Sequence, residues 1–193
     1  MIQYLITDPQ YYTSNLITFK KNLIKALYIP IQENGNEFNY INIACFRDKT
    51  SSNSEELAKI FIEICQSFNI EYILINSNIN LALKLKATGV HLTSQQFDEI
   101  QNAKQHNLFV IISCHSLEEI KQAQTLGADM VTYSPIFETP NKGKPKGCEE
   151  LARVIKEVNI PIIALGGILT TQQILDIKDT KATGFASIRY FIK

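Results

Sequence analysis

Short apolar runs alternate with longer amphipathic stretches along the whole chain. The runs are rich in β-branched residues and are continuous rather than interrupted by polar ones, which is typical of parallel strands covered on both faces. This pattern predicts eight strands, at residues 2–7, 39–46, 71–76, 89–93, 108–113, 129–134, 161–165 and 182–187.

Four of the intervening stretches place apolar residues at helical spacing: residues 54–68, 116–126, 149–158, and from Thr170 or Thr171 to Ile177. The first two begin with a serine that two glutamates follow closely, which is a signal of a helix N-terminus. Gly127 follows residues 116–126 as a natural C-cap. The tract at residues 35–39 is predicted to be a loop.

Strands that alternate with helices indicate βα units and a parallel sheet. Eight such units favour an α/β fold of the closed (β/α)8 TIM barrel type, with an open doubly wound sheet as the alternative. Residues 190–193 stand just after the eighth predicted strand, which ends at residue 187. We therefore expect a short barrel that lacks its last outer helix and leaves the groove between the first and last helices partly uncovered.

The composition narrows the class of protein. The chain has 193 residues and a formal net charge of +0, which suits one domain over residues 1–193 and argues against a nucleic-acid or membrane-surface binder. No signal peptide or apolar run of membrane-spanning length is evident. The four cysteines (Cys45, Cys65, Cys114 and Cys148) lack metal-knuckle spacing and predict free thiols in a reducing cytoplasm.

In a parallel barrel, the active site lies at the carboxyl ends of the strands. The residues directly after the predicted strands are small, polar or cationic, which favours a polar, anionic ligand. The segments concerned are residues 7–8, 47–49, 76–78, 93–96, 113–115, 133–147, 166–167 and 187–189.

Two of these segments suggest phosphate binding. Gly166 and Gly167 follow the seventh strand, where glycines let backbone N–H groups approach a phosphate; a tight turn without ligand is the alternative. Arg47 and Lys49 flank the end of the second strand and could converge on a diphosphate. A surface salt-bridge cluster with Asp48 is the competing interpretation for this pair.

The three histidines have separate interpretations. His106 stands at a predicted helix end and is interpreted as a C-terminal capping group. His91 lies inside a strand and is interpreted as a hydrogen-bonded interior histidine. His115 begins a turn into a helix, beside Ser113 and Cys114, and is interpreted as a capping residue, with acid–base chemistry as the alternative. No set of residues has metal-ligand spacing.

The loops, in this order, resemble the thiamine phosphate synthase/TenI family. The segments that carry the resemblance are TGVHLTSQQ, IISCHSLEEIKQAQTLGAD, SPIFETPNKGKPKG, IPIIALGGI and TGFASI, with YLITD, FRDK and LINSNINLAL upstream, and they cover nearly the whole chain. Synthases of this family join a thiazole alcohol phosphate to a hydroxymethylpyrimidine diphosphate, and the diphosphate leaves with Mg²⁺. The resemblance therefore implies a small phosphorylated thiazole or pyrimidine ligand and a homodimer.

The resemblance also implies roles for single residues. By motif position, Arg47 and Lys49 match the diphosphate-binding cations, Asn76 a diphosphate-side asparagine, and Ser113 a serine near the reacting centre. The remaining matches are Lys142 with the lysine of the flexible loop, and Gly166, Gly167 and the backbone around Ile188 and Arg189 with the thiazole-phosphate site. Lys144 and Lys146 have no counterpart and are predicted to be solvated.

The departures from the synthase pattern concern the metal. The positions that match the Mg²⁺-binding acids hold Ser77, Gln95 and Gln96, and a pyrimidine-side glutamine is replaced by Cys45. A magnesium site needs one or two carboxylates among its oxygen ligands. No cofactor is therefore predicted, and Mg²⁺ belongs only to the synthase interpretation.

The TenI branch, the thiazole tautomerases, also lacks these acids, and the FET at residues 137–139 resembles it. Its histidine base, however, corresponds to Pro135 here, which cannot move a proton. Substitute groups near this position are Ser113, Cys114, His115, Tyr133 and Glu138.

Three hypotheses follow from these matches and departures. The first is a TenI-like binder of thiazole phosphate or thiamine phosphate, with a relocated base or little catalysis. The second is an active synthase with a rebuilt metal site. The third is a non-enzymatic regulator or partner subunit.

Overall fold

Eight parallel strands form a closed barrel in the computed structural model, which describes residues 1–32 and 40–192. The strands are β1 Ile2–Ile6, β2 Ile43–Phe46, β3 Tyr72–Asn76, β4 Gly89–Leu92, β5 Phe109–Cys114, β6 Met130–Tyr133, β7 Ile162–Leu165 and β8 Gly184–Ser187. Strand β1 pairs with both β2 and β8, which closes the sheet. The predicted (β/α)8 barrel is confirmed, and the open sheet is excluded.

All eight predicted strands are present, with ends displaced by a few residues. The largest displacement is in β2, which begins at Ile43. Residue 39, where that strand was predicted to begin, and the predicted loop at residues 35–39 lie outside the described residues.

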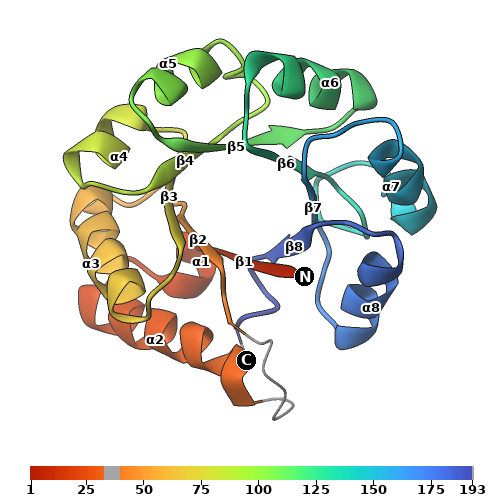
Figure 1. Cartoon of the computed structure of the whole chain (residues 1–193). Coiled ribbons are helices and arrows are strands. Elements are labelled where there is room, and N and C mark those ends of the chain that lie inside the picture. The colour runs from red at the N-terminus through yellow and green to blue at the C-terminus, as the bar shows by residue number, and fades with distance from the viewer. Residues whose placement is uncertain (33–39, 193) are drawn as a thin grey trace.

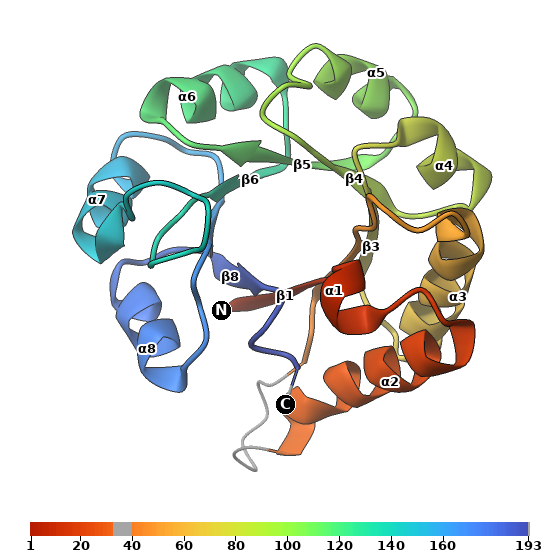
Figure 2. The same ribbon diagram turned by 180° about the vertical axis from the view of Figure 1, so that it is seen from behind.

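Helices surround the barrel on its outside (Figures 1 and 2). They are α1 Pro9–Tyr12, α2 Leu16–Gln32, α3 Ser54–Ser67, α4 Ile79–Lys84, α5 Glu99–Gln105, α6 Leu117–Leu126, α7 Gly147–Ile155 and α8 Thr171–Asp179. The four helices predicted by periodicity are α3, α6, α7 and α8. Their cap predictions also hold: Gly127 ends α6 in the left-handed conformation, and Thr170 opens α8 with a capping box.

The periodicity did not predict α1, α2, α4 or the seven-residue α5, of which only the end at His106 was predicted. Helices α1 and α4 have 4 and 6 residues, too few for a periodic signal. Helix α2 is long, but β-branched residues and Pro30 weaken its helical pattern in the sequence.

The chain departs from full βα alternation at its two ends. Both α1 and α2 lie between β1 and β2, and no helix follows β8 in the described chain up to residue 192, as predicted. Phe191 is fully buried there and stacks on Phe185, with ring centroids 5.9 Å apart. The C-terminal residues lie beside α2 (Figure 1). This segment covers part of the groove that was predicted to be open.

The core has two layers. Side chains from β1, β2, β3, β5, β7 and β8 fill the barrel interior, and a larger apolar layer packs between strands and helices. All four cysteines are free, and burial raises the pKa of each thiol. In the part of the chain that the structure describes, no helix is both long and apolar enough to cross a membrane.

Candidate functional site

The barrel brings the sequence-predicted site residues to one face, at the carboxyl ends of seven strands. They follow or end β2 (Arg47, Lys49), β3 (Asn76, Ser77), β4 (Gln95, Gln96), β5 (Ser113, His115), β6 (Glu138, Lys142), β7 (Gly166, Gly167) and β8 (Ile188, Arg189). A closed parallel sheet places all these strand ends around one opening, the barrel mouth. No local sequence pattern shows that residues after different strands lie close together.

Two cavities open at this face. The larger, about 730 Å³, lies between α1 and the loop after β2, and its lining is Asp8, Pro9, Gln10, Thr13, Ser14, Arg47, Lys49, Thr50, Ser51 and Ser52. The smaller, about 320 Å³, is lined by Phe46, Asp48, Lys49, Ser54, Ile75, Asn76, Ser77, Asn78 and Leu81. Lys49 lines both, so a ligand between them would contact its ammonium group. The sequence interpretation missed the hydroxyl groups of this lining, although a Ser/Thr run after a strand end was a visible signal.

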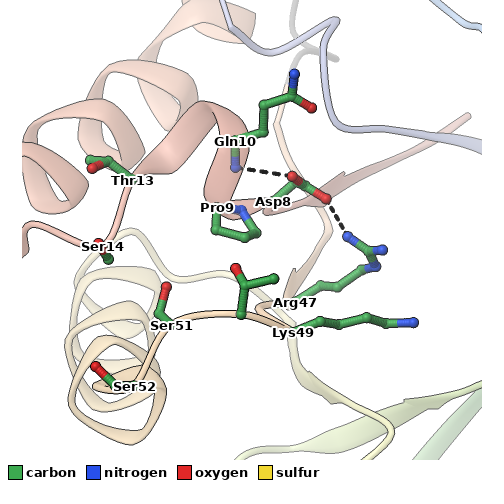
Figure 3. Close-up of a pocket in the computed structure, with 10 residues that line it drawn as sticks. Asp8, Pro9, Gln10, Thr13, Ser14, Arg47, Lys49, Ser51 and Ser52 are labelled. Atoms are coloured by element: carbon green, nitrogen blue, oxygen red, sulfur yellow. Dashed lines mark hydrogen bonds and ion pairs between the residues drawn. The ribbon is translucent and has the colours of Figure 1, made fainter.

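Arg47 is held by a carboxylate inside the larger cavity. Its guanidinium forms an ion pair with Asp8, and Figure 3 shows Arg47 and Lys49 extending in the same direction. Asp8 also accepts a hydrogen bond from Gln10 N, 3.1 Å away, and so caps α1. The salt-bridge interpretation named Asp48 as the partner; the structure corrects this partner to Asp8, which is 39 residues away in the sequence.

Asp48 instead orders the loop after β2. Its Oδ1 accepts hydrogen bonds from the backbone N–H groups of Thr50 and Ser51, each 2.9 Å long. Partial burial opposes ionisation of Asp48, but hydrogen bonds from Ser51 and Thr50, with the Arg47 charge, lower its pKa overall. The two cations near the cavities are therefore accompanied by two carboxylates.

The positions expected to hold magnesium form a neutral bridge between two strand ends. Gln96 Oε1 accepts hydrogen bonds from Thr93 N and Thr93 Oγ1, both 3.1 Å away. Its Nε2 donates to Ser77 O at 3.0 Å. Asn76 donates to His91 O at 2.9 Å, which ties the same two strand ends together.

These residues do not fit a magnesium ion. Ser77 and Gln96 supply no carboxylate, Gln96 uses both ends of its amide in the bridge, and Gln95 is exposed. Within residues 1–32 and 40–192, no group of three or more His, Cys, Asp or Glu side chains could hold a metal. No catalytic step is therefore assigned to Mg²⁺ here.

A buried hydrogen-bonded layer lies beneath the mouth. His91 Nδ1 is 2.7 Å from Tyr4 Oη, and its Nε2 is 3.0 Å from Ser113 Oγ and 3.5 Å from Thr132 Oγ1. Burial, with the Arg47 charge, lowers the pKa of His91 to about 4. His91 is thus a neutral, hydrogen-bonded interior residue, as predicted, and it ties Ser113 to the barrel interior.

The glycine pair after β7 receives the loop after β6. Ile136 N donates to Leu165 O at 2.9 Å, and Phe137 N donates to Gly166 O at 3.0 Å. A Cβ on Gly167, whose φ is 70°, would lie 2.4 Å from Glu138 O. Close packing at positive φ therefore explains both glycines as a tight turn. Their phosphate-binding role stays a prediction, and they line neither cavity.

The lysines of the same loop separate into two groups. Lys142 and Lys144 are exposed. Lys146 Nζ lies 4.9 Å from the centre of the Tyr133 ring, a cation–π arrangement. The prediction that Lys146 is simply solvated is therefore wrong.

His115 contacts the loop after β6 rather than capping α6. The N-cap of α6 is Ser116, whose Oγ accepts from Glu119 N. The His115 ring turns back instead, with Nδ1 3.1 Å from Ser134 O. The capping interpretation of His115 is wrong, whereas His106 contacts Asn102 O at the end of α5, as predicted for a capping group.

Comparison with known proteins agrees with this geometry. A family model described as thiamine monophosphate synthase matches residues 3–191. The Aquifex aeolicus protein named "Putative thiamine-phosphate synthase 2" is 33% identical to this chain, over 98% of this chain and 97% of its own length. The thiamine-phosphate synthase of Halalkalibacterium halodurans is 31% identical, over 73% of this chain and 71% of its own.

A solved structure gives the same result. The thiamine phosphate pyrophosphorylase of Pyrococcus furiosus superimposes with a TM-score of 0.77 at 25% identity, over 97% of this chain and 85% of that protein.

Proposed function

We propose that this chain, which belongs to the thiamine monophosphate synthase family, binds a thiazole phosphate or thiamine phosphate at the carboxyl ends of its strands. We propose further that it does not perform magnesium-dependent coupling at the rate of a synthase. One observation carries both statements: cavities lined by Arg47 and Lys49 adjoin a bridge in which Gln96 occupies a predicted metal-ligand position.

Charge explains why this arrangement favours binding over coupling. A departing diphosphate carries several negative charges, and a metal ion stabilises such charge by several kcal/mol. Here Arg47 is already paired with Asp8, so Lys49 and the exposed Lys142 are left to supply positive charge. Since about 1.4 kcal/mol corresponds to a tenfold change in rate, loss of the metal implies a slower reaction by orders of magnitude.

An active synthase is the second candidate, supported by the names of the relatives and by Arg47, Lys49 and Asn76 at the cavities. A non-enzymatic regulator or partner subunit is the third. All three hypotheses share the phosphorylated ligand and differ in turnover.

Calorimetry and one coupling assay test the proposal. Binding of the thiazole phosphate at micromolar concentration is expected, with little thiamine phosphate formed from the two synthase substrates and Mg²⁺. Lys49→Gln should weaken binding because Lys49 lines both cavities, while Lys178→Gln, which removes an exposed charge from α8, should not. Rapid thiamine phosphate formation would establish the synthase instead, and absence of binding would overturn the proposal.

Homodimer formation and a cytoplasmic location remain predictions. Leu169, in the loop before α8, and Leu175, within α8, are 43% and 48% exposed, and apolar side chains of this kind supply dimer contacts. Light scattering at micromolar concentration tests the mass, and Leu175→Glu should lower it if α8 forms the interface. The free cysteines support a reducing compartment.

A further inference from the structure

The side chain of His115 reaches the residue that precedes Pro135. Strands β5 and β6 pair with Ser113 opposite Thr132, so the positions two residues further along also meet. There, His115 Nδ1 lies 3.1 Å from Ser134 O and 3.3 Å from Ser134 Oγ. The imidazole of His115, directly after β5, thus lies beside the position where the tautomerase pattern has its histidine.

The Ser134 carbonyl favours one tautomer of this ring. A carbonyl oxygen only accepts hydrogen bonds, and it lies closer to Nδ1 (3.1 Å) than the Ser134 hydroxyl does (3.3 Å), so the contact favours the neutral ring with its proton on Nδ1. The Nε2 atom then holds the lone pair. No hydrogen bond to Nε2 is formed within the described part of the chain, and the residue is only partly buried. His115 therefore presents a basic nitrogen that is not already used by the fold.

The backbone around His115 is also fixed. Its N–H donates to the Glu119 carboxylate, and Ser116 caps α6 directly after it. A ring held through Nδ1 on an ordered backbone loses little freedom when a ligand binds, which is what an acid–base group requires.

Three of the four other candidate groups at this rim are buried or already hydrogen-bonded, and no contact orients the carboxylate of the fourth, Glu138, in the described part of the chain. Tyr133 and Cys114 are buried, and burial raises the pKa of each to about 12. Ser113 is hydrogen-bonded to His91, which is itself buried. Glu138 is exposed, and its backbone packs against Gly167.

We propose that His115 is the relocated catalytic base of this site, acting through Nε2 on a bound carboxylated thiazole phosphate; this rests on the proposed function. Nε2 takes the proton from the ring carbon that bears the carboxylate. The freed electron pair shifts the double bonds through the ring to the exocyclic carbon, which takes the proton back from Nε2–H. Atoms and charge balance, and the Ser134 carbonyl stabilises the transient imidazolium.

His115→Asn is the decisive variant because the asparagine amide can still donate to Ser134 O but offers no basic nitrogen. General acid–base catalysis contributes about 10²- to 10⁴-fold, so turnover should fall by at least about 100-fold while ligand affinity stays within about threefold. His106→Asn is the matched control, since His106 Nδ1 also contacts a backbone carbonyl, Asn102 O, on an exposed helix end.

The outcomes separate this inference from the proposed function. If the wild-type protein fails to bind the thiazole phosphate, both the proposed function and the inference about His115 are overturned. If it binds but neither converts the tautomer nor exchanges the ring proton for deuterium, the binding function stands and the inference is overturned. Retention of turnover by His115→Asn would overturn it as well. Independently, ¹⁵N NMR should show His115 protonated on Nδ1, and an Nε2–H tautomer would contradict the geometry.

Discussion

On one side of the barrel mouth, which we call the β2–β4 rim (Arg47, Asn76, Ser77, Thr93 and Gln96), side chains hold neighbouring loops together. On the other side lies the β5–β7 rim, which consists of His115, Ser134, residues 135–139, Gly166 and Gly167. There, backbone hydrogen bonds and close packing against the two glycines, which have no Cβ atoms, hold the loops together. In the first rim, Arg47, Asn76 and Gln96 are already engaged by other groups of the protein. The second leaves the His115 Nε2 available.

The difference teaches that uncharged side chains can join strand ends at positions where the resemblance predicts metal ligands. The Gln96 amide joins the ends of β3 and β4 at the predicted metal-ligand positions. An amide is neutral, so this bridge supplies no negative charge for a metal ion. The opposite rim depends on close backbone contact, which tolerates little change in side-chain volume. We therefore expect substitutions at the β5–β7 rim to affect stability most and substitutions at the β2–β4 rim to change ligand and ion binding.

Gly167→Ala should have the largest effect. Its Cβ would lie 2.4 Å from Glu138 O and 2.7 Å from Phe137 C, at a φ of 70°, so we expect a loss of about 3 kcal/mol or more in unfolding free energy. Gly143→Ala is the control: its φ is 66°, but nothing lies within 4 Å of its Cβ position, and about 1 kcal/mol is expected. Equal urea midpoints for the two variants would contradict the packing argument.

His91, beneath both rims, should make stability depend on pH. Its pKa is lowered from 6.5 to about 4 in the folded state, so the unfolded chain binds more protons between these values. The contribution is fully present above pH 6.5 and is lost as the pH falls toward 4, by up to about 1.4 kcal/mol per unit. His91→Gln should flatten this part of the unfolding free energy profile. An unchanged slope would show that His91 is not the group responsible.

The glutamine bridge can be removed or turned into a metal site. Gln96→Ala should lower the unfolding free energy by about 1–3 kcal/mol because its three partner atoms lose their hydrogen bonds, whereas Gln95→Ala at an exposed position should have little effect.

In the double variant Ser77→Asp, Gln96→Glu, Mg²⁺ at ten times its dissociation constant should raise the unfolding free energy by about 1.4 kcal/mol, or the Tm by roughly 4 °C. Asp suits position 77, where φ is 59°. A Mg²⁺-dependent Tm in the wild-type protein would contradict the neutral-bridge interpretation.

The smallest effect is expected from releasing Arg47. Asn at position 8 can still cap α1 but leaves the guanidinium without its carboxylate, so Asp8→Asn should raise affinity for inorganic pyrophosphate by about threefold. Asp98→Asn removes the same charge where the carboxylate makes no capping hydrogen bond. Equal gains in titration calorimetry would show that net charge, rather than the Arg47–Asp8 pair, controls binding.

Much of the fold could be predicted because its signals are local. Continuous β-branched runs predicted each strand, and Ser116, Gly127 and Thr170 marked helix ends that the structure confirms. Helix α2 was missed because tertiary packing of residues such as Phe19 and Leu23 stabilises a helix whose local signal is weak.

The sequence by itself determined which residues stand at the strand ends, since each follows its own apolar run. Only the tertiary structure decided their partners: Asp8 with Arg47, Ser77 with Gln96, and Ser134 with His115. These contacts join segments 19 to 39 residues apart. Closure of the barrel brings such loops together, and no local pattern of polar and apolar residues records which of them meet.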